Sequence, residues 1–446
     1  MKEEFLHFIW KNGLFGSNEP ETSSGNKLLI IDPGTYNRDA GPDFFNSRIR
    51  VGGTEWAGNV EIHINASDWY RHKHHLDHSY DNVILHVVVN NDTFVKTASG
   101  IEPETFVISW QKEVEERYNN YFNNPQLIAC SGDIGNIPAF SIRHWISRMA
   151  IEKLEIKISK YKDALRSTNN DWDETLYRLL SRYFGLKVNS EPFNLLACRM
   201  PLKIIRKHAD NRLQVESLLY GQAGMLEPGV FEKEIYDEYY TSLLREYRIL
   251  KKKYSLKPIN PWMWKYHRLR PVNFPTIRIS QLAGLLCKSR SLFGMVKDSK
   301  TIGDLARIFH CEASGYWNNH YIFGSYKKGR VKRTGNTMID LLLINTIIPL
   351  LFLYGKETGN AAHCSRATDL LDNIEPEDNR LTREWGRIGI IACSALESQG
   401  MIHLLEVYCK NRRCLDCQFG SKLISLGKNI GSGEKYLLEE PFRPTD

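Results

Sequence analysis

Residues 41–87 read GPDFFNSRIRVGGTEWAGNVEIHINASDWYRHKHHLDHSYDNVILHV and combine strand patterns with many acidic and histidine side chains. Two runs have strand character, Phe44 to Val51 and Asn59 to Ile64, and glycines separate them, which predicts a hairpin. The β-branched run from Val83 to Val89 predicts a central strand. This stretch therefore predicts the sheet of an N-terminal domain.

Carboxylates in this stretch suggest a metal site. Asp43 stands just before the first strand, whereas Glu61 and His63 are two residues apart on the second strand and so share one face. If the two strands pair, Asp43 and Glu61 approach closely enough to share one divalent cation. Oxygen ligands of this kind favour Mg²⁺ or Mn²⁺.

Pro42-Asp43 and Glu61-Ile62-His63 resemble the motif of the PD-(D/E)XK nuclease superfamily. The resemblance implies that Asp43 and Glu61 hold the metal, with an added carboxylate from Glu3 or Glu4. His63 stands where the motif has lysine, and a neutral imidazole acts as a base or a ligand instead of supplying a positive charge. A degenerate core without catalysis and an unrelated chemistry are the alternatives.

Further histidines follow Glu61 and His63 within a few residues. Imidazole and carboxylate together would favour Zn²⁺, Mn²⁺ or Fe²⁺. The alternative interpretation is a solvated turn, with one histidine buried inside the strand. The residues concerned are His72, His74, His75, Asp77, His78 and His86.

Outside this stretch the pattern changes near residue 112 from strand-like to helical spacing. We therefore predict an α+β protein, with a small mixed-sheet, nuclease-like N-terminal domain in residues 1–125 and a larger all-helical domain in residues 126–446. The charge divides in the same way. Residues 1–125 hold 11 Lys+Arg against 18 Asp+Glu, a net charge of −7, which leaves +14 for the remainder of a chain whose net charge is +7.

The chain shows the features of a cytoplasmic protein without a membrane partner. The most apolar segment, Met338 to Tyr354, is interrupted by Asp340 and Asn345, which predicts a buried core helix. The first residues, MKEEFLHFIW, carry acids where an export signal needs cations. Nine cysteines at irregular spacing are typical of reduced thiols.

Cys409, Cys414 and Cys417 form a C-x4-C-x2-C pattern in VYCKNRRCLDCQFG. This spacing suits a zinc ion or an iron–sulfur cluster, and some nucleases of the superfamily above carry such a cluster at the end of the chain. A fourth ligand must come from upstream, and His403, Cys393 and Cys364 are candidates. Three reduced thiols in a tight turn are the alternative.

Two basic stretches of the helical part are candidate contacts for nucleic acid, because cations bind phosphates and interleaved aromatics stack on unpaired bases. The alternative is packing between helices and solvated loops. The candidate residues are Arg268, Arg270 and Arg278 in PWMWKYHRLRPVNFPTIR, and Lys328 and Arg330 in KKGRVKRTG.

Four stretches across the chain resemble an uncharacterised bacterial family, domain of unknown function 2851. They are NVEIHINASDWYRHKHHLDHSYDNVILHVV, PLKIIRKHADNRLQVESLLYGQAGML, RLRPVNFPTIRISQLAGLL and YCKNRRCLDCQFG. The resemblance implies no activity, so the residues carry the functional prediction. That prediction is a metal-dependent phosphodiesterase acting on DNA or RNA. The alternatives are a non-catalytic nucleic-acid or protein-binding module and a zinc-dependent hydrolase of small substrates.

Overall fold

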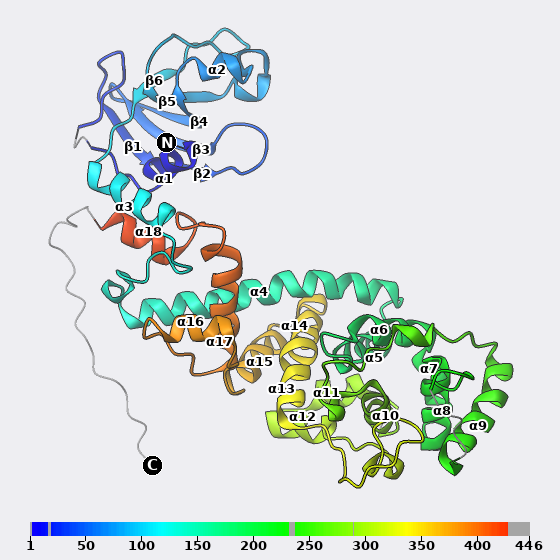
Figure 1. Ribbon diagram of the computed structural model, residues 1–446. Helices are drawn as coiled ribbons and strands as arrows, with labels where there is room; N and C mark the ends of the chain where they lie inside the picture. The colour runs from blue at the N-terminus through cyan, green and yellow to red at the C-terminus, as the bar shows by residue number, and fades with distance from the viewer. Residues whose placement is uncertain (1, 17–18, 232–236, 289, 427–446) are drawn as a thin grey trace. The chain divides into compact units, whose positions relative to one another are not determined.

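A computed structural model describes residues 2–16, 19–231, 237–288 and 290–426 (Figure 1). The chain forms two compact units. The first contains residues 1–145 together with the segment that begins at Leu404, and the second contains Ile146–His403. The bounds differ from the division at residue 125 that composition predicts, because the segment after His403 returns to the first unit.

A mixed six-stranded sheet is the centre of the first unit. Its strands follow the order β1-β3-β4-β5-β6, and β2 pairs with β3 outside this path. β1, β3 and β4 are antiparallel neighbours, whereas β4, β5 and β6 run parallel. The strands are β1 (Leu28–Asp32), β2 (Thr35–Tyr36), β3 (Phe44–Val51), β4 (Thr54–Asn65), β5 (Val83–Asn90) and β6 (Glu104–Val107).

The β3–β4 hairpin forms where the sequence predicts it. Val51 pairs with Thr54 across a turn in which Gly52 and Gly53 have φ angles of 54° and 94°. Left-handed backbone at both central residues is the geometry that glycine accommodates in a tight hairpin turn. The register of this hairpin places the start of β3 beside the buried part of β4, because Phe44 pairs with Val60.

The parallel connection from β4 to β5 is made of three short helical turns. These are α2 (Asp68–Arg71), η1 (His74–Leu76) and η2 (His78–Tyr80). Trp69, Tyr80 and Val88 pack together in a small apolar cluster and hold this connection on the sheet. The histidine-rich part of the sequence is therefore pinned over the sheet.

Helices complete the first unit. α1 (Glu3–Lys11) buries five apolar side chains and contacts β4. α3 (Lys112–Asn123) lies beside α18 (Gln418–Ser425), so the last described helix packs on this unit (Figure 1). The turn η3 (Ile134–Asn136) also contacts α18, and the π-helical turn η8 (Leu404–Cys409) precedes it.

The second unit is helical around one large apolar core. The long helix α4 (Ala139–Ser167) leads into it. The remaining helices are α5 (Trp172–Phe184), α6 (Ser190–Arg199), α7 (Leu202–Arg206), α8 (Arg212–Gln222), α9 (Glu238–Tyr254), η4 (Pro261–Met263), η5 (Pro271–Asn273), α10 (Pro275–Leu286), α11 (Leu292–Asp298), α12 (Ile302–Phe309), η6 (Gly315–Asn318), α13 (Asn336–Leu342), η7 (Leu343–Ile347), α14 (Ile348–Glu357), α15 (Ala361–Asp372), α16 (Arg380–Gly386) and α17 (Ala395–His403).

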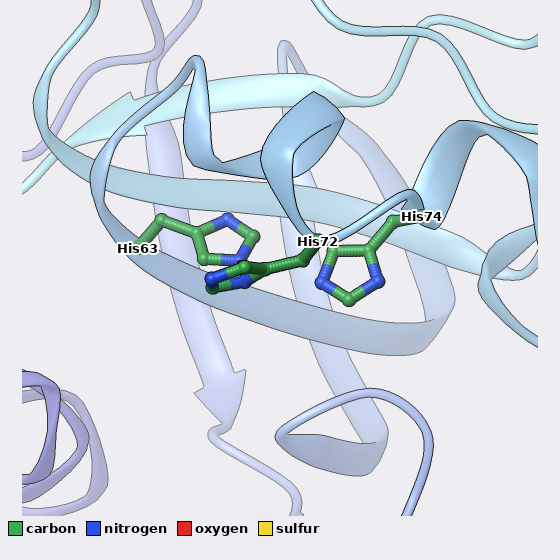
Figure 2. A group of neighbouring side chains, drawn as sticks. All are labelled: His63, His72 and His74. Atoms are coloured by element: carbon green, nitrogen blue, oxygen red, sulfur yellow. The ribbon is translucent and has the colours of Figure 1, made fainter.

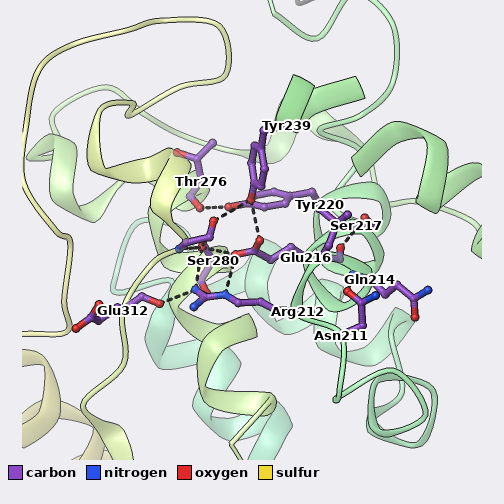
Figure 3. A network of polar contacts seen from close by, with 12 residues as sticks. Asn211, Arg212, Gln214, Glu216, Ser217, Tyr220, Tyr239, Thr276, Ser280 and Glu312 are labelled. Atoms are coloured by element: carbon purple, nitrogen blue, oxygen red, sulfur yellow. Dashed lines mark hydrogen bonds and ion pairs between the residues drawn. The ribbon is translucent and has the colours of Figure 1, made fainter. Parts of the chain in front are cut away.

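A buried polar network joins α8, α9 and α10 in this core (Figure 3). The Glu216 carboxylate is 2% exposed and accepts hydrogen bonds from the Ser280 and Tyr239 hydroxyls, at 2.5 and 2.8 Å. Arg212 Nε donates to the same carboxylate at 3.3 Å, and Nη2 donates to the carbonyl oxygen of Glu312. Each of these polar groups has a hydrogen-bond partner, so the network links the helices without the free-energy cost of a buried polar group left unpaired.

The segment Asn336–Glu357 is long and apolar enough to cross a membrane, but 78% of its most apolar window is buried inside the protein. It forms the continuous run α13, η7 and α14 in the core of the second unit. The predicted core helix at Met338 to Tyr354 is confirmed. The α+β class is also confirmed, with a sheet that precedes a helical region in the sequence.

Candidate metal centre

Two neighbouring strands and the turns between them bring histidines onto one face of the sheet. Glu61 and His63 lie on β4, and His86 of β5 is the register partner of Glu61. His72 ends α2 and His74 begins η1, so both follow Trp69, which is fully buried against the sheet. Figure 2 shows the imidazoles of His63, His72 and His74 beside one another.

The donor atoms of this group have the spacing of metal ligands. His63 Nε2 lies 3.2 Å from His72 Nδ1 and 3.5 Å from Glu61 Oε1, and His74 Nε2 lies 3.2 Å from the same Glu61 oxygen. Ligand bonds of about 2.0–2.1 Å in a tetrahedron place neighbouring donors about 3.4 Å apart. The three histidine donors all lie within 4.8 Å of one another. The group therefore matches a one-metal site without rearrangement.

A second layer of contacts fixes these ligands in orientation. His63 Nδ1 lies 2.9 Å from His86 Nε2, so a hydrogen bond joins the two rings and leaves His63 Nε2 facing His72 and Glu61. The Asp43 backbone N–H donates to Glu61 Oε2 at 3.0 Å, and the Ile62 N–H donates back to the Asp43 carboxylate at 2.9 Å. Partners of this kind set the tautomer and direction of metal ligands.

Protonation states in the buried group also fit metal binding. Burial and the nearby His86 lower the pKa of His63 to about 2, and burial lowers the pKa of His74, so both imidazoles are neutral. Burial and the Asp43 carboxylate raise the pKa of Glu61 to about 9. The buried Nε2 of His74 makes no hydrogen bond within the described residues. A donor set of three imidazoles and one carboxylate suits Mn²⁺, Zn²⁺ or Fe²⁺ better than Mg²⁺, which prefers oxygen.

An open basic cleft of about 690 Å³ lies beside α1, and none of Glu61, His63, His72 and His74 lines it. Its lining includes His7, whose Nε2 lies 3.2 Å from Asp43 Oδ2 and whose Nδ1 lies 3.2 Å from the Tyr36 hydroxyl. The charged residues of the lining comprise five cations and two anions: Lys2, Lys11, Arg38, Arg412 and Arg413 against Glu4 and Asp416. A cleft of this sign favours an anionic substrate.

Comparison with known proteins adds a family but no activity. The family described as protein of unknown function (DUF2851) matches residues 3–380. The chain belongs to this family. No curated protein and no solved structure matches the chain.

The structure brings together the residues that the N-terminal motif predicts. The Glu61 carboxylate accepts from the Asp43 N–H and the Asp43 carboxylate accepts from the Ile62 N–H, and His63 lies in the histidine group. His72 and His74 belong to the group, whereas His78 pairs with Asp81 at the surface. Sequence reasoning missed His7, because an amphipathic helix carries no sign of which polar side chain faces the sheet.

The C-terminal cysteines lie in the first unit with a fourth cysteine that the sequence did not indicate. The fourth cysteine is Cys130, which follows α3. Its thiol interacts electrostatically with the thiols of Cys409, Cys414 and Cys417. The upstream candidates lie elsewhere, because Cys364, Cys393 and His403 belong to the second unit, where the His403 ring lies 3.0 Å from the Glu152 carboxylate. No spacing rule could select Cys130, since nearly 280 residues separate it from Cys409.

The basic residues predicted to contact nucleic acid belong to the second unit. Arg268, Arg270, Lys328 and Arg330 are exposed. Arg278 is 7% exposed, and its guanidinium donates to Gln281 at 2.9 Å and to Asn273 at 2.6 Å. A side chain so occupied is not placed to bind phosphate, so the prediction for Arg278 is withdrawn.

Cation binding is expected to release about one proton per site at neutral pH. Glu61 is protonated below about pH 9, and the cation competes with that proton, so affinity for Mn²⁺ should rise about 10-fold per pH unit from about pH 6 to pH 8. Calorimetry in two buffers of different ionisation enthalpy measures the proton release directly. An affinity that does not change with pH would contradict Glu61 as the protonated ligand.

Proposed function

We propose that this protein is a metal-dependent phosphodiesterase that acts on DNA or RNA in the cytoplasm. The observation that carries the proposal is the group of Glu61, His63, His72 and His74, in which only His72 is exposed, together with an open basic cleft lined by His7, whose ring contacts Asp43. The order of elements supports it: Asp43 directly precedes strand β3, strand β4 carries Glu61 and His63, and a helical connection then leads to the parallel strand β5.

The residues of the chain have distinct roles in this proposal. Glu61, His63, His72 and His74 would hold the cation, and His86 and the Asp43 backbone orient them. When bound, such a cation lowers the pKa of a water molecule and withdraws charge from a phosphoryl oxygen. Four protein donors leave coordination positions free for a water molecule and substrate only in a six-coordinate ion, which favours Mn²⁺ or Fe²⁺ over a four-coordinate Zn²⁺.

His7 is placed to move protons between the site and the cleft. Its ring lines the cleft, while its two nitrogens contact the Asp43 carboxylate and the Tyr36 hydroxyl. A histidine with a carboxylate partner serves as a general acid or base near neutral pH. The lysine of the nuclease motif has no counterpart at His63, which acts as a ligand here.

The shape and charge of the cleft distinguish this proposal from its alternatives. A hydrolase of small substrates needs a closed pocket around Glu61, whereas the cleft is open and lined with cations. A non-catalytic binding module would share the cleft but would cleave nothing. The deciding experiment incubates the purified protein with single- and double-stranded DNA and RNA in EDTA, Mg²⁺, Mn²⁺ or Zn²⁺. Cleavage that requires a cation supports the phosphodiesterase.

Lys11 is expected to contribute one phosphate contact in the cleft. Lys11→Ala should weaken nucleic-acid binding and reduce the slope of log K against log salt by about 0.7–0.9, the value for one counterion released. Binding titrations at four salt concentrations measure the slope. Lys112→Ala is the matched control, since Lys112 is an exposed lysine of the same unit outside the cleft. Equal slopes for the two variants would show that the cleft does not bind the phosphate backbone of the nucleic acid.

A further inference from the structure

Four cysteines meet at the junction of two segments that are far apart in the sequence. Cys409 ends η8, Cys414 lies in the next turn, and Cys417 directly precedes α18. Cys130 lies between α3 and η3, and α18 contacts both of these elements. The four cysteines therefore come from the two segments that this packing brings together.

Arg412 joins these two segments directly. Its φ angle of 53° is left-handed, and its guanidinium donates to the carbonyl oxygens of Asn124 and Leu127, just before Cys130. The turn is closed tightly on its other side, because a Cβ atom added at Gly420 would lie 2.2 Å from the carbonyl oxygen of Cys414. These contacts hold the segment that carries Cys409, Cys414 and Cys417 against the segment that carries Cys130.

The surroundings of the four cysteine sulfurs are typical of metal ligands. Each of the six pairs among Cys130, Cys409, Cys414 and Cys417 interacts electrostatically, and all four thiols are free of disulfides. The backbone N–H groups of Phe419 and Gly420 donate to the Cys417 sulfur.

The spacing of the sulfurs distinguishes a cluster from a single ion. Zinc–thiolate bonds of about 2.3 Å place the sulfurs of a tetrahedral site about 3.8 Å apart. Across the described residues, only His63, His72 and His74 bring three ligand atoms within 4.8 Å of one another. The four sulfurs are therefore more widely spaced than one zinc ion holds them, which suits a larger inorganic core with one cysteine at each corner.

We propose that Cys130, Cys409, Cys414 and Cys417 bind an iron–sulfur cluster that joins the C-terminal segment to the first unit. The cluster would hold one wall of the basic cleft, because Asn411, Arg412 and Arg413 of the same turn line it. This site is separate from the histidine group, and it does not depend on the proposed hydrolysis. Its role is structural, and no electron transfer is required of it.

The full-length protein, purified without oxygen, tests the proposal. We expect iron and acid-labile sulfide in equal amounts, roughly two or four of each per chain, with a broad visible absorption that dithionite bleaches. Cys130→Ser should lose most of the iron, the sulfide and the absorption. Cys198→Ser is the matched control, since Cys198 is an exposed cysteine of the second unit and should leave all three unchanged.

Each outcome decides the proposal. Iron and sulfide that persist in Cys130→Ser would exclude Cys130 as a ligand. Wild-type protein with about one zinc per chain and no sulfide would overturn the cluster in favour of a single ion. Wild-type protein with neither metal, also after incubation with ferrous iron and sulfide, would show that the four thiols bind nothing. The wild-type result stands even if Cys130→Ser does not fold. Glu61→Gln should retain the full cluster content, which separates this site from the histidine group.

Discussion

Replacing Glu61 with glutamine is expected to lower metal-dependent hydrolysis by about 10³-fold or more. Loss of that size corresponds to about 4 kcal/mol of transition-state stabilisation, within the several kcal/mol that a bound cation supplies. Glutamine preserves the shape of the side chain and can still accept the Asp43 N–H, but it removes the anionic ligand that lies 3.2 Å from His74 and 3.5 Å from His63. The measurement is kcat/KM on a labelled oligonucleotide at saturating Mn²⁺.

Glu55→Gln is the matched control for that variant. Glu55 lies on the same strand, β4, but it is exposed and pairs with Arg48 and Arg50 on the surface. An exposed change of this kind should alter neither activity nor stability by more than about 0.5 kcal/mol. If Glu61→Gln retains wild-type activity, or if both variants lose activity equally, the site around Glu61 is not the catalytic centre.

Glu216→Ala is expected to destabilise the second unit by about 3 kcal/mol or more. The substitution removes the buried acceptor that the Ser280 and Tyr239 hydroxyls share, and it leaves Arg212, which is 36% exposed, without its ion-pair partner. Hydrogen exchange measured by mass spectrometry should show faster exchange in α8 and α10, and urea titration should give the lower free energy of unfolding.

Glu375→Ala controls for the loss of a glutamate from the same unit. Glu375 is exposed, so its removal should change stability by less than about 0.5 kcal/mol. Unchanged exchange in α8 and α10 of Glu216→Ala would contradict the role of the network in holding these helices. The activity of Glu216→Ala on nucleic acid reports whether the second unit is needed for cleavage.

The sheet and the part of the metal centre on β4 were predictable from sequence, because side chains along a strand alternate between its two faces with a period of two residues. Alternation along β4 puts Glu61 and His63 on one face, and the glycine pair after Val51 sets the hairpin that brings Asp43 to them. These contacts are local, since a tight turn determines the register of the strands on either side. The α+β class followed from the change to helical spacing after the last strand.

The remainder of the centre depends on tertiary contacts that no periodic pattern in the sequence predicts. His72 and His74 lie in short turns, where Trp69 and its packing against the sheet decide which imidazoles face Glu61. His75 and His78, their neighbours in the sequence, are equally good ligands by type but lie outside the group. Cys130 shows the same limit at longer range, because only the packing of α18 on α3 and η3 brings it to Cys409.

A metal titration of nucleic-acid cleavage tests the central claim most directly. The protein is stripped with EDTA, Mn²⁺ is added in steps, and bound metal and initial cleavage rate are measured on the same samples. The account predicts no cleavage in EDTA and a rate that rises in proportion to occupancy of one site per chain, with both lost in a His72→Ala, His74→Ala double variant. A filled site with no cleavage of any DNA or RNA substrate would contradict the phosphodiesterase and leave a metal-binding module.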